Sequence, residues 1–368
     1  MFRYALNILL YQPLRLFFTI VGVALCVILM LFLLGVYRGI EFGSMEYIRQ
    51  NRADMWVLQK NSWNVLRGSS LIPSGVGDVI MDIEGIESAS PVLFLLPGVR
   101  YGEKISTVFL IGYDPEKPLG KPPHILEGRT LSADDEIVID KAFSKRMGAG
   151  LGDTVSIDDH RLRVVGISTN TNAFVIQYVF VTVTRAQRIA GIPGIVSAFM
   201  IKHASDRATA DMRTLILSDL PGVEIYDHET FVANNLKEMK SGMLPLLFII
   251  AAIAAIVLTA ILSLLLSINI LERRKDYAVM KILGSPARGL IKSVLGQALM
   301  LGLSGSVIGM ALFFPVCACI EIAAPEMSPQ SSAGQIAVVH LSVAVISTLS
   351  SLISLQRLRR IFPLEVFE

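Results

Sequence analysis

The chain has 368 residues, of which 53% are hydrophobic and only 17% are charged, and its mean hydropathy is +0.59. A single soluble domain of this length does not carry so much apolar sequence, so we expect an integral membrane protein. The formal net charge of +2 gives no indication of nucleic acid as a partner. The three cysteines, Cys26, Cys317 and Cys319, fall in apolar runs and have neither disulfide nor metal-site spacing.

The first elements in chain order are a short amphipathic segment, 1–13, and a membrane span, 14–40. The span is built on the uncharged run 16–37, and about 20 apolar residues are enough to cross the hydrocarbon core of a bilayer. Because no small-residue cleavage site follows the run, it predicts a retained anchor rather than a signal peptide.

A large domain, 41–240, follows the first span and mixes apolar alternation with turn signals. The turn at 158–160 joins two of its predicted strands. The predicted strands cover 136–140, 154–157, 161–167, 175–182 and 196–202, and the predicted helices cover 141–147, 184–190 and 206–219. These patterns predict an α+β domain with one or two lobes.

Three more spans are predicted at 241–272, 293–320 and 336–356, because each contains a long run without Asp, Glu, Lys or Arg. The last is the weakest, since it contains several serines and His340. Neither 38–49 nor 230–240 contains a proline, so the first two spans are expected to continue as paired helices outside the membrane, with a kink of the second at Gly242 and Pro245.

Basic residues predict the orientation, because Lys and Arg collect in the short cytoplasmic segments of membrane proteins. The segment 273–292 and the tail 357–368 are rich in them, whereas the loop 321–335 has two glutamates and no basic residue. Both termini are therefore predicted to be cytoplasmic, and the large domain to be extracytoplasmic.

The large domain shows no motif for catalysis. It lacks a phosphate-binding loop, an HExxH pair and a GxSxG elbow, and its histidines are isolated in sequence. The acidic run 134–136 is interpreted as a solvated turn rather than an acid/base pair. We assign no catalytic, cofactor-binding or metal-ligating residue, and we expect the chain not to be an enzyme.

The spans themselves argue against an ion-coupled carrier, because intramembrane charges usually mark ion pathways and these spans have none. Two pairs of small residues at four-residue spacing, Gly305 with Gly309 and Ala251 with Ala255, are typical of helix packing. The sequence leaves open whether such contacts form within one chain or between chains.

The segment 270–285, ILERRKDYAVMKILGS, is the most informative motif. It resembles the stretch after the second span of MacB/FtsX-type (type VII) ABC permeases, whose usual pattern is ERxxEIAxL(K/R)ALG. The order of spans and the basic, proline-containing tail 359–366 are similar to that family as well. Asp276, Tyr277, Met280 and Ile282 depart from the pattern but keep its general character.

The resemblance implies an α-helical membrane protein of four transmembrane helices, with a large extracytoplasmic α+β domain (a MacB-like core) inserted between helices 1 and 2. It also implies a permease subunit in the bacterial inner membrane that works as a dimer with a second copy or a paralogue. ATP and magnesium would be bound by a separate cytoplasmic ATPase dimer. A periplasmic adaptor and membrane lipid are compatible further partners.

By the same resemblance, ATP hydrolysis in the partner would change the shape of the extracytoplasmic domain, a mechanism called mechanotransmission. The process would export or extract an amphiphile, lipoprotein, peptide or antibiotic. Two alternatives stay open: an FtsX-like activator of an extracytoplasmic enzyme, and an ATP-independent sensor or scaffold whose extracytoplasmic domain binds a ligand.

The segment 273–292 is expected to be the contact with the ATPase. Apolar residues at i, i+3 and i+4 predict an amphipathic helix there, and Gly284 before Ser285 and Pro286 predicts that it ends as a short finger. The alternative is a basic helix lying on anionic lipid. The predicted coupling residues are Glu272, Arg273, Ala278, Val279, Lys281, Ile282, Leu283 and Gly284.

Overall fold

The structure is a computed structural model that describes residues 13–65, 70–173, 176–204, 209–272, 287–324 and 331–359, together with residues 275, 278, 279 and 282. The chain divides into two compact units, which we call the membrane unit and the α+β unit. The membrane unit comprises Met1–Tyr37, Pro245–Ile320 and Pro329–Glu368, and the α+β unit comprises Arg38–Leu244 and Glu321–Ser328.

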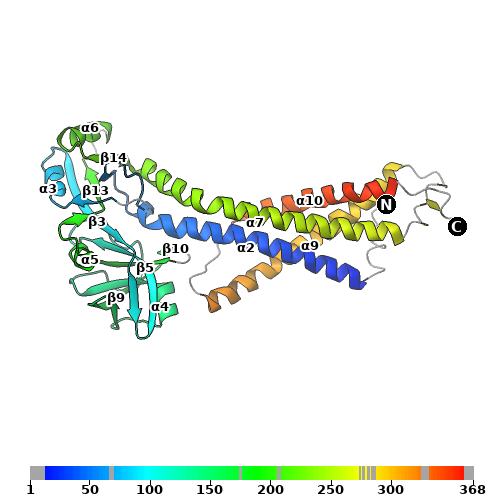
Figure 1. Cartoon of the computed structure of the whole chain (residues 1–368), viewed down its shortest axis with the longest axis horizontal. Helices are drawn as coiled ribbons and strands as arrows, with labels where there is room; N and C mark the ends of the chain where they lie inside the picture. Colours follow the sequence, from blue (N-terminus) through cyan, green and yellow to red (C-terminus); the bar gives the residue numbers. More distant parts are fainter. Residues whose placement is uncertain are drawn as a thin grey trace. The chain divides into compact units, whose positions relative to one another are not determined.

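Four long helices carry the apolar sequence (Figure 1): α2 (Pro13–Gln50), α7 (His228–Glu272), α9 (Ala287–Ala323) and α10 (Ala333–Arg359). Each contains a stretch that is long and apolar enough to cross a membrane, which confirms the four predicted spans. As predicted, α2 and α7 continue without a break beyond the first two spans, so each helix has residues in both units.

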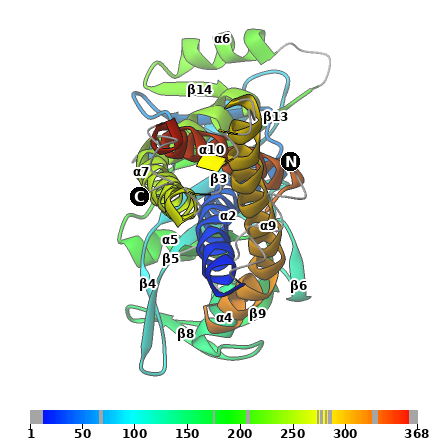
Figure 2. The ribbon, with the colours of Figure 1, turned by 90° about the vertical axis from the view of Figure 1, so that its right-hand side faces the viewer.

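The membrane unit packs its four helices around a buried aliphatic core, and Figure 2 shows the helices nearly end-on. The core draws on every helix of the unit, through residues such as Val27, Leu258, Leu301 and Val343. Large apolar side chains also point outward from the same helices, as expected of a surface that faces lipid rather than water.

In the α+β unit, six strands form a closed barrel. Each strand pairs with two neighbours in the ring β5-β11-β7-β9-β8-β4, and the parallel pairing of β11 with β5 closes it. Buried side chains fill the barrel and pack with α4 (Lys141–Met147). The barrel strands are β4 (Gly98–Tyr101), β5 (Lys104–Tyr113), β7 (Glu136–Asp140), β8 (Thr154–Ile157), β9 (His160–Ser168) and β11 (Ile176–Thr182).

The remaining strands extend the barrel or flank it. From β5 the sheet continues through β3, β13 and β1 to β14. These strands are β3 (Ile86–Leu95), β13 (Ala198–His203), β1 (Met55–Gln59) and β14 (Val223–Asp227). The short strands are β2 (Ile72–Pro73), β6 (Ile125–Gly128), β10 (Asn172–Ala173) and β12 (Ile195–Val196).

The two faces of this sheet extension have different cores. One face packs against α3 (Val76–Met81) and α6 (Thr209–Asp219), and α5 (Val183–Ala190) packs on β5 and β3. The other face, with Trp56 and Met200, packs against side chains of α2 and α7, such as Met45 and Phe231. Both long helices are therefore part of the hydrophobic core of the α+β unit.

Several local predictions match the structure. Strand β7, helix α4 and strand β8 have the predicted bounds. Helix α4 begins where the Asp140 carboxylate accepts the backbone N–H of Ala142 at 2.7 Å, and it ends at Gly148 with φ 79°. The predicted strand 196–202 is interrupted between β12 and β13, and the predicted helix 206–219 is described only from Thr209 onward.

Candidate functional site

The predicted coupling residues are only partly within the described chain. Arg273, Lys281, Leu283 and Gly284 lie outside the described residues. The other four are placed as follows. Glu272 is the last residue of α7, Ala278 is buried, and Val279 and Ile282 are 43% and 53% exposed. Their assignment to an ATPase contact stays a prediction, and the two exposed aliphatic side chains are available to such a partner.

The small residues of α9 lie against two neighbouring helices within the chain. A Cβ atom added at Gly305 would come 2.6 Å from Val23 of α2, and one added at Gly309 would come 2.8 Å from the carbonyl oxygen of Ala24. Gly302, which the sequence analysis did not single out, is in similarly close contact with Ser347 of α10. Glycine allows the helix backbones to approach this closely.

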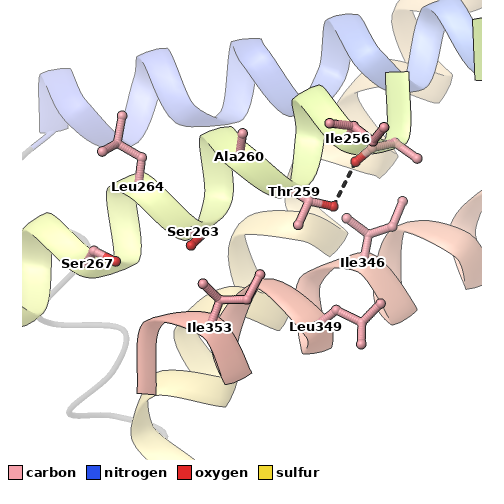
Figure 3. A pocket seen from close by; sticks show the side chains of 10 residues that line it. Ile256, Thr259, Ala260, Ser263, Leu264, Ser267, Ile346, Leu349 and Ile353 are labelled. Atoms are coloured by element: carbon pink, nitrogen blue, oxygen red, sulfur yellow. Dashed lines mark hydrogen bonds between the residues drawn. The ribbon is translucent and has the colours of Figure 1, made fainter. Parts of the chain in front are cut away.

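The other predicted pair lies on α7. Ala255 is half-buried against the membrane core, and Ala251 is half-buried one turn earlier. Further along α7, the serines of α10 bind its backbone: Ser350 Oγ donates to the carbonyl of Thr259 at 3.3 Å, and Ser354 Oγ donates to that of Ser263 at 3.0 Å. These bonds give two of the serines of the fourth span a role in packing α10 against α7, and Figure 3 shows the two helices side by side at Thr259 and Ser263.

The C-terminal part of α2 is attached to the α+β unit by two buried polar side chains. Tyr47 Oη donates to the carbonyl of Gly120 at 3.1 Å, and the Gly120 N–H donates to Asn51 Oδ1 at 2.7 Å. Asn51 Nδ2 also donates to the carbonyl of Lys121 at 3.3 Å. Gly120 has φ 103°, a conformation that favours glycine. We call this set of contacts the α2 joint.

The barrel contributes to the same attachment. Tyr178 on β11 donates its hydroxyl hydrogen bond to the carbonyl of Ser44 at 3.0 Å, and its ring stacks with that of Tyr47 at 6.3 Å between centroids. Burial raises the pKa of Tyr178 well above its usual range, so this hydroxyl stays a donor at physiological pH.

The N-terminal part of α7 is attached to the other end of the sheet. Phe231 stacks on Trp56 of β1 with ring centroids 4.4 Å apart, and Asn235 Oδ1 accepts the backbone N–H of Val65 at 3.0 Å. Lys240 of α7 lies 3.9 Å from Glu41 of α2, which links the two helices. Both helices are thus tied to the sheet and to each other within the α+β unit.

The acidic run 134–136 is not simply a solvated turn, and that prediction is wrong for Glu136. The Glu136 side chain is 2% exposed, forms an ion pair with Arg129, and accepts the N–H of Ser132 at 2.8 Å. Hydrogen bonds from Arg129 lower the pKa of Glu136 to about 2. A carboxylate held so firmly in its ionised form is suited to anchoring the 129–136 turn, not to carrying protons.

Two other carboxylates of the α+β unit also have structural partners. Asp140 caps α4 and accepts the hydroxyl hydrogen of Thr171 at 2.7 Å, while Asp134 forms ion pairs with Arg185 and Arg188. Within the described ranges, no three His, Cys, Asp or Glu side chains come together as a metal site would require. These two carboxylates therefore hold elements of the unit in place.

The fold and these attachments define a four-span integral membrane protein with an α+β domain inserted after its first span. Sequence comparison assigns the family. The family model for the MacB-like periplasmic core domain matches residues 16–216. The family model for the FtsX-like permease C-terminal region matches residues 248–363. The chain belongs to the MacB/FtsX-type family of ABC transporter permeases.

Full-length relatives agree with this assignment. An uncharacterized ABC transporter permease of Mycobacterium tuberculosis is 27% identical over 99% of this chain and 98% of its own length. Another, from Mycobacterium bovis, is 24% identical with the same coverage of both chains.

Among solved structures, the periplasmic region of MacB from Actinobacillus actinomycetemcomitans is similar with a TM-score of 0.41 and 16% identity. The match covers 50% of this chain and 94% of that one. The extracellular domain of the noncanonic ABC-type transporter YknZ has a TM-score of 0.38 and 11% identity, covering 48% of this chain and 100% of its own.

Proposed function

We propose that this ABC permease is driven by a separate cytoplasmic ATPase, and that it transmits the ATPase cycle through α2 and α7 to its MacB-like domain. The movement would export or extract an amphiphile, lipoprotein, peptide or antibiotic already outside the cytoplasm. Membership of an ABC permease family implies an ATPase partner. We expect ATP and magnesium to bind to that partner and not to this chain.

One observation supports the proposal above others: α2 and α7 are continuous helices whose residues belong to both units. A helix transmits a shift along its axis because its backbone N–H groups are bonded four residues back. In α7 one of these bonds is missing at Pro245, the first residue of that helix in the membrane unit. The side chains of Tyr47, Asn51 and Asn235 bond the two helices to loops of the α+β unit. Contacts with Tyr178 of β11 and Trp56 of β1 attach the same helices to the strands. We therefore expect a displacement of either helix along its axis to move the attached strands, because no loop interrupts the helix between the two units.

The first test concerns the contact with the ATPase. We expect Ile282→Asp to insert normally, because the side chain is half exposed, yet to reduce ATPase co-purification and permease-stimulated hydrolysis at least tenfold. Lys292→Asp is a matched control, since Lys292 is another exposed residue in the same predicted cytoplasmic segment. Equal ATPase recovery with both variants would mean that Ile282 is outside the contact.

The second test concerns transmission. Ser241 is an exposed residue of α7 in the α+β unit, and Ser241→Pro removes one helical hydrogen bond, at a cost of about 3 kcal/mol to the helix. We expect the proline variant to keep ATPase binding while hydrogen exchange in the α+β unit stops responding to ATP. Ser241→Ala keeps the helix and should respond like the wild type. A normal response in the proline variant would contradict transmission through α7.

A further inference from the structure

Both long helices join the sheet at the same end of one strand pair. Helix α2 ends at Gln50 shortly before β1 begins at Met55, and α7 begins at His228 directly after β14 ends at Asp227. Met55 pairs with Asp227 in the antiparallel ladder, so the two connections lie side by side. Met55 also pairs with Ile201 of β13, which brings the end of that strand to the same place. We call residues 51–54, 202–203 and 227–229 the helix junction.

The first residue of α7 is a half-buried histidine with an unpartnered ring atom. Nδ1 of His228 is buried and has no hydrogen-bond partner in the described chain. A neutral imidazole with its hydrogen on Nε2 has no N–H at this position, whereas a protonated imidazole has an N–H on both nitrogens. Protonation of His228 would therefore bury a donor without an acceptor, which costs free energy in the folded state.

The two aspartates of the helix junction are already bonded. Asp54 Oδ1 lies 2.8 Å from Lys202 Nζ, and Asp54 Oδ2 accepts the N–H of His203 at 3.0 Å. Asp227 Oδ1 accepts the N–H of Thr230 at 2.9 Å, and Asp227 Oδ2 accepts the hydroxyl hydrogen of the same residue at 2.7 Å. A protonated imidazole would have to displace one of these bonds to gain either aspartate as a partner.

The surrounding charges also oppose protonation of His228. Burial lowers the pKa of His228 below its usual value of 6.5, and the cations Lys202 and Arg52 lower it further. Glu229 and Asp227 act in the opposite direction and do not reverse the shift. An opened junction consequently takes up a proton at a higher pH than the folded one, so opening is favoured as the pH falls below about 6.5.

The other histidine of the helix junction has a different environment. His203 Nδ1 lies 2.9 Å from the carbonyl oxygen of Ala204, and its Nε2 lies 3.1 Å from Thr209 Oγ1. Both oxygens can accept, so a protonated His203 has an acceptor for each of its N–H groups. The missing acceptor therefore distinguishes His228 from its neighbour.

We propose that the helix junction is an acid-sensitive switch, in which protonation of His228 releases the first turns of α7 from the sheet. Phe231, one turn further along α7, stacks on Trp56 of β1, so the release would loosen this contact as well. In the predicted topology the α+β unit is outside the cytoplasm, where the pH follows that of the surroundings. The proposal does not depend on the ATPase partner or on the transported substrate.

Hydrogen–deuterium exchange of the full chain at pH 7.5 and pH 5 tests the proposal, with each exchange rate divided by the intrinsic rate at the same pH. Peptides covering 228–236 report opening of the first turns of α7. Peptides of α4 report a helix of the same unit that is outside the junction. Glu136 stays ionised at pH 5, because its pKa is about 2, so its titration does not contribute.

We expect the opening equilibrium of the 228–236 peptides to rise about 5- to 30-fold from pH 7.5 to pH 5, while the α4 peptides stay unchanged. The lower value is the effect of one unpaired buried donor, and the upper value is the limit set at pH 5 by an ordinary histidine pKa of ~6.5. His228→Gln should remove the rise, whereas His203→Gln should preserve it. Arg52→Gln should make the rise about twofold smaller, because one exposed cation that opposes protonation is gone.

An absent rise in the wild type, or an equal rise in His228→Gln, overturns the proposal. If His228→Gln is already unprotected at pH 7.5, Arg52→Gln decides instead, because it leaves the imidazole in place. A rise in Arg52→Gln equal to that of the wild type then overturns the proposal, and a smaller rise supports it.

Discussion

The α2 joint offers a direct test of how firmly the long helices are attached to the α+β unit. Asn51 is buried, and its Oδ1 accepts the buried N–H of Gly120 at 2.7 Å. Asn51→Ala leaves this N–H without a partner, which costs about 1–3 kcal/mol. The local opening equilibrium of the loop around Gly120 should therefore rise about 5- to 160-fold.

Hydrogen–deuterium exchange of the full chain measures this change in peptides that contain Gly120. Gln50→Ala is the matched control, because Gln50 is the adjacent residue, is exposed, and its side chain donates to Glu46 of its own helix at 3.0 Å. Tyr47→Phe should have a smaller effect in the same peptides, since it removes one hydrogen bond and leaves the ring in place.

The double variant of Tyr47 and Asn51 should be less than additive, because both side chains bind Gly120. If the Gly120 peptide of Asn51→Ala exchanges at the wild-type rate, the joint contributes nothing measurable. Transmission of movement from α2 to the sheet would then have to rely on apolar packing alone.

Three further predictions concern packing, charge and topology. Gly305→Ala should lower the melting temperature of the purified chain, because overpacking against α2 costs about 1–3 kcal/mol, whereas Gly22→Ala, with its nearest neighbour 3.9 Å away, should not. Glu136 has its folded pKa lowered from 4.5 to about 2, so its contribution, on the order of 2–3 kcal/mol, is present above pH ~4.5 and is lost as the pH falls towards 2. Arg129→Gln should destabilise the α+β unit at pH 7 and weaken this dependence, because Arg129 is the largest cause of the lowered pKa; an unchanged acid-unfolding curve would contradict the assignment. For topology, Asp159→Cys in a background without native cysteines should react with an impermeant maleimide in intact cells, and labelling only after lysis would reverse the predicted orientation.

Sequence alone was sufficient for features that depend on neighbouring residues. The four spans follow from uncharged runs, because a charge in hydrocarbon is costly wherever the helix packs. Helix α4 was predictable to the residue, since Asp140 and Gly148 are local start and stop signals. The segment 270–285 identified the family for the same reason: its residues are consecutive.

Strands such as β1, β3 and β5 were not predicted, and neither was the barrel. Its closure depends on β11 pairing in parallel with β5, strands that are separated by three other barrel strands in the chain. Such pairing reflects which strands meet after folding, and strand patterns do not specify their partners.

Parts of the candidate site were also found only in the structure, because they too depend on contacts between residues that are distant in sequence. Asn51 is an ordinary polar residue in sequence, and its role appears only because the loop at Gly120, about 70 residues later, lies beside α2. Glu136 looks solvated beside two aspartates, yet the fold buries it with Arg129. Helices α7 and α10 are far apart in sequence, and their contact through Ser350 and Ser354 appears only in the structure. Sequence determined which segments enter the membrane, because the cost of burying charge is set residue by residue, whereas contacts between distant segments were decided by tertiary packing.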